Sequence, residues 1–109
     1  MYSVDGNEIT LSRGDSFSLK IQLKNRQVAD GSTGLFTMKK KPKMSAEALV
    51  EKTVTISGNQ AEIVLDSEDT KELSARTYYW DFRVIDPDGL VSTPMEYAGF
   101  TILEVIGNV

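Results

Sequence analysis

The stretch TYYWDFRVIDPDGLVSTPMEYAGFTIL, residues 77–103, decides the fold of this chain. Tyr78, Trp80, Phe82 and Val84 stand two positions apart, and neighbouring side chains in a pleated strand point to opposite faces. The four apolar side chains therefore share one face, and the residues between them share the other. This pattern predicts a long strand with one buried face.

The same stretch predicts a chain reversal directly after this strand. Asp86-Pro87-Asp88-Gly89 combines a proline that presets φ, aspartates that can bond their own backbone and a glycine that accepts positive φ. The apolar alternation resumes at Phe100 and Ile102. We therefore expect an antiparallel pair of strands with a common apolar face.

Further strands are predicted by alternating apolar residues elsewhere in the chain. The expected strands span residues 8–12, 16–24, 35–40, 50–56 and 61–65. Gly58-Asn59 between the last two indicates a hairpin. Lys52 interrupts the apolar face of the first hairpin strand, which places it near an edge of the sheet, where a lysine can extend to water.

The segment 66–73 predicts a short helical turn before the aromatic strand. Asp66 is a capping residue, and acids follow it in the first turn. A crossing turn followed by a tyrosine is typical of the tyrosine corner in immunoglobulin-like domains, and residues 69–78 have that form. The segment 44–49 is too short for an independent helix and is interpreted as a connector.

Together these patterns predict an all-β fold for residues 1–109, a single immunoglobulin-like antiparallel β-sandwich of about seven strands with one short helical turn. We expect one contiguous core between two sheets, with Trp80 at its centre. The predicted core residues are Phe17, Leu19, Ile21, Phe36, Ile63, Tyr78, Trp80, Phe82, Val84, Phe100 and Ile102.

The composition argues against several classes of function. The chain has no cysteine and no histidine, which removes disulfides, thiolate ligands and the usual general base. A net charge of −4 argues against nucleic-acid binding, and no apolar run is long enough to span a bilayer. No basic and apolar leader opens the chain, so synthesis inside a cell is expected.

Two groups of acids could in principle act as an acid and a base. Asp66 with Glu68 and Asp69 belongs to the predicted helix start, and Asp86 with Asp88 belongs to the predicted turn. Neither has a metal-ligand set or a phosphate-binding loop beside it, and a lone turn offers too few oxygens for calcium. We expect neither an enzyme nor a cofactor or metal.

In the order of its motifs, the chain resembles the immunoglobulin-like N-terminal domain of tailed-phage baseplate upper proteins and similar small phage structural proteins. The resemblance covers nearly the whole chain. It is carried by Arg13-Gly14-Asp15 before SFSLKIQLK, and then by LFTMKKKP, IVLDSEDTKEL, RTYYWDFRVIDPDGLVST and GFTI. It implies a structural module of a virion tail or baseplate, made in the bacterial host cytoplasm, that binds other phage proteins or itself.

Tyr79, Arg83 and Tyr97 are the candidate partner-binding residues. The alternation places them, together with the final strand, outside the core, and exposed aromatics and arginine are favoured at interfaces. Strand addition at an open edge would contribute to such a contact. The alternative is a carbohydrate-binding or adhesion module that uses Tyr79 and Tyr97 as stacking platforms.

Two polar motifs have simpler interpretations. Arg13-Gly14-Asp15 is an integrin-recognition tripeptide, but a glycine between polar residues at a strand junction is also an ordinary turn. The lysines of residues 39–43, interrupted by Pro42, could contact phosphate or an acidic partner surface, but they also fit a solvated loop at the end of a strand. We favour the turn and the loop.

Overall fold

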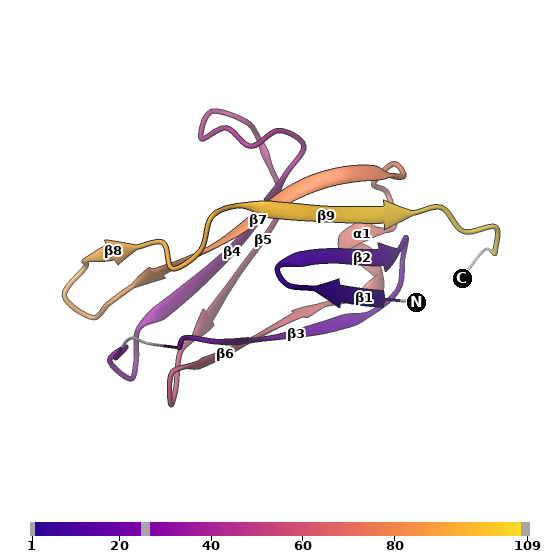
Figure 1. Ribbon diagram of the computed structural model, residues 1–109. Coiled ribbons are helices and arrows are strands. Elements are labelled where there is room, and N and C mark those ends of the chain that lie inside the picture. The colour runs from indigo at the N-terminus through magenta and orange to yellow at the C-terminus, as the bar shows by residue number, and fades with distance from the viewer. Residues whose placement is uncertain (1, 25–26, 108–109) are drawn as a thin grey trace.

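The computed structural model describes residues 2–24 and 27–107, which form two packed β-sheets and one helical turn (Figure 1). The elements are β1 (Tyr2–Asp5), β2 (Glu8–Ser12), β3 (Phe17–Gln22), β4 (Thr33–Lys39), β5 (Ala48–Thr55), β6 (Gln60–Leu65), α1 (Ser67–Thr70), β7 (Arg76–Ile85), β8 (Val91–Ser92) and β9 (Ala98–Leu103). The predicted immunoglobulin-like β-sandwich is confirmed, with β1 and β8 as additional short strands.

The two sheets are very unequal in size. The larger one has the order β1-β2-β9-β7-β4-β5, with β8 beside part of β7, and the smaller one contains only β3 and β6. The prediction of a wholly antiparallel sandwich is wrong for one pair, because β2 runs parallel to β9. The β1–β2 hairpin places β2 on the outer side of β9, so one edge of the large sheet belongs to the start of the chain.

Strand β7 shows the predicted alternation along its whole length. Tyr78, Trp80, Phe82 and Val84 are all buried, and the residues between them are partly exposed. Tyr78 lies opposite Phe100 of β9, so the predicted antiparallel pair is confirmed. On its other side β7 pairs with β4, which makes it an internal strand of the sheet.

The predicted turn after β7 also forms. The Asp86 carboxylate accepts hydrogen bonds from the backbone N–H groups of Asp88 and Leu90, at 3.0 and 2.9 Å. Gly89 has a φ of 88°, which a side chain would disfavour. The chain returns through β8 to β9, and the reversal predicted from Asp86 to Gly89 is confirmed.

The predicted hairpin between residues 50–56 and 61–65 is wrong. Strand β5 pairs with β4 in the large sheet and β6 pairs with β3 in the small sheet, so the chain crosses from one sheet to the other at Gly58-Asn59. Ile56, which is fully buried, lies at this crossing. The crossing lets the apolar faces of β5 and β6 meet across the core, whereas a hairpin would place them side by side.

The predicted core is largely confirmed, and two of its residues are not fully buried. Leu19 and Ile21 of β3 are only partly covered, because among the described residues β3 pairs with β6 on one edge and with no strand on its other edge. The buried residues of the predicted set are Phe17, Phe36, Ile63, Tyr78, Trp80, Phe82, Val84, Phe100 and Ile102.

Trp80 is buried, but it does not occupy the centre of the core. Phe36 is fully buried and contacts both the Trp80 ring, at a centroid distance of 5.5 Å, and the Phe100 ring, at 6.4 Å. The indole Nε1 of Trp80 donates to the backbone oxygen of Asn7 in the β1–β2 turn, at 2.9 Å. A buried indole N–H needs such a partner, and this bond holds Trp80 at the rim of the core.

The crossing turn before β7 has the predicted form. The Asp66 carboxylate accepts from the Glu68 N–H at 3.0 Å, and the Asp69 carboxylate accepts from the Asp66 N–H at 2.8 Å, which is a reciprocal cap. The Tyr78 hydroxyl donates to the Ser74 carbonyl at 2.8 Å, as in a tyrosine corner. Lys52, on the edge strand β5, lies 3.0 Å from the Asp69 carboxylate, so it pairs with α1 and does not extend freely into water.

The prediction that the final strand lies outside the core is wrong. Strand β9 pairs with β2 on one side and with β7 on the other, and Ala98, Phe100 and Ile102 are buried. It offers no open edge to a partner. The segment 44–49 contains no helix; residues 44–47 form the predicted connector, whereas Ala48 and Leu49 already belong to β5.

We expect Trp80→Ala to destabilise the domain by about 3 to 5 kcal/mol, because it leaves a cavity beside Phe36 and an unpaired oxygen at Asn7. Urea unfolding followed by circular dichroism would measure this loss. Thr53→Ala, at an exposed position of β5, is the control and should change stability by less than about 0.5 kcal/mol. A Trp80→Ala protein as stable as this control would contradict the observed register of β7.

Gly34→Ala should also destabilise the domain, by about 1 to 3 kcal/mol, because it overfills the contact between β4 and β7. A Cβ at Gly34 would lie 2.8 Å from Cε1 of Phe82 and closer still to Cζ. Gly107→Ala is the matched control, since a Cβ there meets no atom within 4 Å. Equal melting temperatures for the two variants would show that the Phe82 ring can move aside at no cost.

Candidate partner-binding groove

The outward face of the large sheet is the floor of a groove. Strand β4 runs between β5 and β7, so outward side chains of the three strands lie in rows across the sheet. The rows are Arg83, Leu35 and Thr53; Asp81, Thr37 and Glu51; and Tyr79, Lys39 and Ala48. Tyr79 and Lys39 are therefore direct cross-strand neighbours, and Asp81 and Glu51 lie on either side of Thr37.

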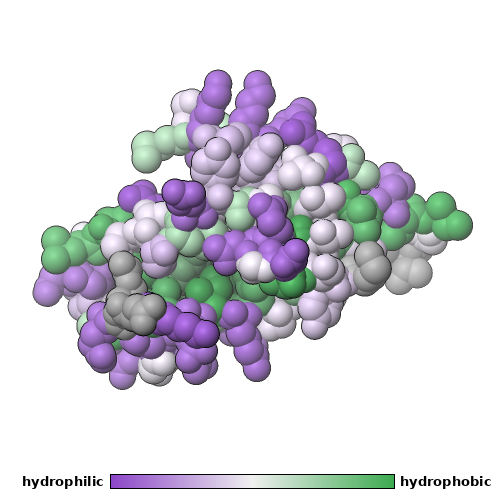
Figure 2. Space-filling model, viewed as in Figure 1, coloured by the Kyte–Doolittle hydropathy of each residue, from purple (hydrophilic) through white to green (hydrophobic). Residues whose placement is uncertain are grey.

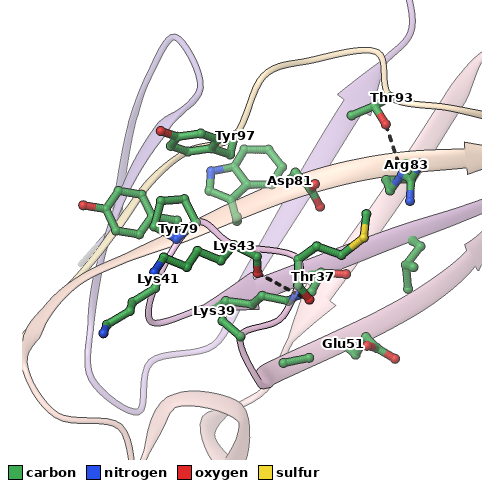
Figure 3. A pocket seen from close by; sticks show the side chains of 16 residues that line it. Thr37, Lys39, Lys41, Lys43, Glu51, Tyr79, Asp81, Arg83, Thr93 and Tyr97 are labelled. Carbon is green, nitrogen blue, oxygen red and sulfur yellow. Dashed lines mark hydrogen bonds between the residues drawn. The ribbon is translucent and has the colours of Figure 1, made fainter.

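Two loops rise beside this floor and turn a flat sheet face into a groove of about 620 Å³. One wall is the loop 40–47 between β4 and β5, and the other is the segment 93–97 between β8 and β9 (Figures 1 and 3). The Lys39 ammonium donates to the backbone oxygens of Lys43 and Met44, at 3.2 and 2.9 Å. Lys39 thus ties the first loop to the strand from which it rises.

The three residues predicted to bind a partner all line this groove. Tyr79 and Tyr97 make an edge-to-face pair, with ring centroids 5.8 Å apart and planes at 85° (Figure 3). Tyr97 is 58% exposed, and Tyr79 is partly buried. The Arg83 Nε donates to the Thr93 hydroxyl at 3.0 Å, which fixes the guanidinium against the second wall. Their use in binding stays a prediction.

The groove is positively charged on an acidic protein. Lys39, Lys41, Lys43 and Arg83 line it, against two carboxylates, Asp81 and Glu51, so its net charge is +2 while the whole chain carries −4. The sequence alone identifies the lysine cluster and allows its contact with an acidic partner, but it favours a solvated loop. The loop is exposed as predicted, and its position beside Tyr79 became visible only in the folded chain.

The acidic groups considered for catalysis are engaged in structure. Asp66 and Asp69 cap α1, and Asp86 holds the turn after β7. Across residues 2–24 and 27–107 no group of three or more acidic side chains is arranged to hold a metal ion. Within the same residues, no helix has the length and apolar character needed to cross a membrane.

Arg13-Gly14-Asp15 forms the turn between β2 and β3, as predicted. The Arg13 Nε donates to the Glu104 carboxylate at 2.9 Å, and its Nη1 donates to the Lys71 carbonyl at 3.0 Å. The Arg13 bond to the Glu104 carboxylate, together with a bond from the Val105 N–H, holds the pKa of Glu104 below its usual range. Gly14 has a φ of 80°, and its N–H donates to the Thr70 hydroxyl at 2.9 Å. Arg13 is thus engaged at the surface with Glu104 and Lys71 of the same chain, which accounts for the tripeptide as a structural turn.

Comparison with known proteins is informative at the level of the family. No curated protein has a significantly similar sequence. Among solved structures, the extracellular domain of the voltage-gated sodium channel beta4 subunit, described as a parallel homodimer with a role in cell–cell adhesion, is 12% identical over 97% of this chain and 99% of that one. Its TM-score is 0.40, which carries no argument about this protein. The family model described as "LtfC-like, beta-sandwich domain" matches residues 4–99, and the chain therefore belongs to the LtfC-like β-sandwich family.

Proposed function

We propose that this protein is a non-enzymatic structural module of a phage or prophage virion, which binds another phage structural protein through the groove on the large sheet. The observation that carries the proposal is the convergence of Tyr79, Arg83 and Tyr97 in one positively charged hollow. The motif order that resembles baseplate upper proteins supports the assignment to a tail or baseplate. The virion, assembled in the bacterial host cytoplasm, is the proposed location.

The groove has the chemistry of a protein-binding surface. Tyrosine and arginine are enriched among the residues that dominate interface energies, because they bury large area or make several hydrogen bonds. Two tyrosine rings already packed against each other lose little freedom on binding. Such a preformed hollow fits a protruding loop or strand of a partner.

The charge of the groove indicates the character of that partner. A net charge of +2 favours an acidic surface, and complementary charge accelerates encounter and selects against basic proteins. Outside the groove the chain carries a net charge of −6, from −4 minus +2, so another copy could also supply acidic residues. A different phage structural protein is the preferred partner because baseplate proteins of this kind join unlike components.

Carbohydrate binding is the second candidate, since the same groove combines Tyr79 and Tyr97 with the carboxylates of Asp81 and Glu51. Sugar rings stack on aromatic faces and bond to carboxylates. The two tyrosine rings are at 85° to each other, however, and perpendicular rings do not form one continuous platform for successive sugars. Binding on a glycan array, lost in Tyr97→Ala, would favour this candidate over protein binding.

We expect the double variant Tyr79→Ser with Arg83→Ser to weaken binding to the partner at least tenfold while the fold survives. Truncating central interface residues costs about 2 kcal/mol or more each, whereas both side chains lie outside the core. The measurement is calorimetric titration of the purified chain with each product of the neighbouring phage structural genes, together with the melting temperature.

Val64→Ser is the matched control for this experiment. Val64 lies on β6 of the other sheet and is 56% exposed, so its replacement should leave both binding and melting unchanged. A double variant as unstable as a core truncation would mean that Tyr79 and Arg83 serve the fold. Binding equal to that of the unmodified chain would place the interface elsewhere, and failure to bind any neighbouring gene product would remove the proposed role.

A further inference from the structure

A second hollow, of about 310 Å³, opens between the β1–β2 hairpin and β3. Figure 2 shows hydrophobic surface inside a recess on this side of the molecule, and Figure 1 shows β3 running below the hairpin. The apolar residues that line it are Val4, Ile9, Leu19, Ile21, Leu23, Trp80, Phe82, Pro94 and Met95. This recess is separate from the groove on the outward face of the large sheet and reaches into the core itself.

The recess exists because the small sheet is incomplete. Immunoglobulin-like sandwiches have up to four strands in the corresponding sheet, whereas the described residues supply only β3 and β6. Leu19 and Ile21 point toward the core but are only partly buried, as expected where a neighbouring strand is missing. At the start of β3 the Tyr2 ring of β1 packs on Phe17, with a centroid distance of 4.9 Å.

The free edge of β3 is suited to accept another strand. The Leu23 N–H, directly after β3, donates to the Asn59 oxygen, directly before β6, at 2.9 Å, which continues the register of the two strands. Opposite residues of an antiparallel pair alternate between bonded and non-bonded positions. The odd-numbered residues of β3 therefore bond to β6, and Ser18, Lys20 and Gln22 direct their N–H and C=O groups to the open side.

The charge along this edge selects the occupant. Lys20 and Lys24 are the only charged residues among the described residues that line the recess, and both are exposed. An acidic residue placed beside Lys20 would be stabilised, and a lysine there would be destabilised. A second copy that paired its own β3 antiparallel to this one would bring lysine-bearing edges together, which disfavours self-pairing.

We propose that β3 is a docking edge for an extended segment of a partner protein, which adds a third strand to the small sheet. Apolar side chains at alternate positions of that segment fill the recess against Leu19, Ile21 and Met95. Acidic side chains at the intervening positions face Lys20. This contact is independent of the groove at Tyr79 and does not require it.

A nine-residue peptide in which valine alternates with glutamate is the probe, and its counterpart with lysine in place of glutamate is the charge control. Trp80, the single tryptophan of the chain, lines both the recess and the groove, so its fluorescence reports occupancy of the recess when the double variant Tyr79→Ser with Arg83→Ser gives the same titration. We expect saturable binding of the glutamate peptide and binding several-fold weaker for the lysine peptide. No saturation by the glutamate peptide up to about 1 mM would overturn the proposal.

Lys20→Pro tests whether the backbone edge is used, because proline removes the outward N–H donor yet is tolerated on an edge strand. Lys20→Ala keeps that N–H and is the matched variant. We expect Lys20→Pro to abolish binding of the glutamate peptide, and Lys20→Ala only to reduce its charge preference. Equal binding by Lys20→Pro and Lys20→Ala would exclude strand addition at β3.

A third measurement does not depend on the stability of the proline variant. The glutamate peptide N-methylated at alternate residues, on the edge that would face β3, should not bind the unmodified chain. Methylation of the opposite edge should leave binding unchanged. If instead the unmodified chain dimerises with rising concentration and Lys20→Pro stays monomeric, the occupant is a second copy and the proposed partner segment is wrong.

Discussion

The pairing of β7 on both of its edges is the constraint on which the rest of the structure depends. Strand β4 bonds to one side and β9 to the other, so every second side chain of β7 must enter the core. Phe36 from β4 and Phe100 from β9 then meet beside Trp80, in ring contacts that bring the three strands into one buried cluster. Burial of such large rings supplies much of the free energy that offsets the ordering of a domain this small.

The outward face of the same strands becomes the floor of the groove through the same alternation of side chains. When alternate side chains of β7 are buried in the core, the side chains between them must point outward at a fixed spacing. Tyr79 and Arg83 are held in this way, without contributing to the core. The loop 40–47, which Lys39 ties to β4, and the segment 93–97 then form walls around them. The groove is therefore a consequence of sheet register together with two loops, and it requires no catalytic chemistry.

The unequal sheets give the molecule a second kind of surface. Six strands of the large sheet lie in one continuous order, while β3 and β6 cover them only in part. As a consequence, Leu19 and Ile21 of β3 remain partly exposed, and the backbone N–H and C=O groups on one edge of β3 face outward. Natural sheets protect such edges with charge, and Lys20 and Lys24 are placed where they discourage pairing with other lysine-bearing edges.

The sequence by itself determined the alternation of β7, the turn at Asp86, the cap at Asp66 and the class of the fold, because these depend on residues close together in the chain. Tertiary structure decided that β5 and β6 join different sheets, that β2 runs parallel to β9 and that Trp80 lies at the rim of the core. An alternating pattern predicts which face of a strand is apolar, but it does not predict which other strand pairs with that strand. Of the residues that line the groove, the sequence pointed to Tyr79, Arg83 and Tyr97 as exposed side chains. Its charge could not, because only folding brings the loop 40–47 over the sheet.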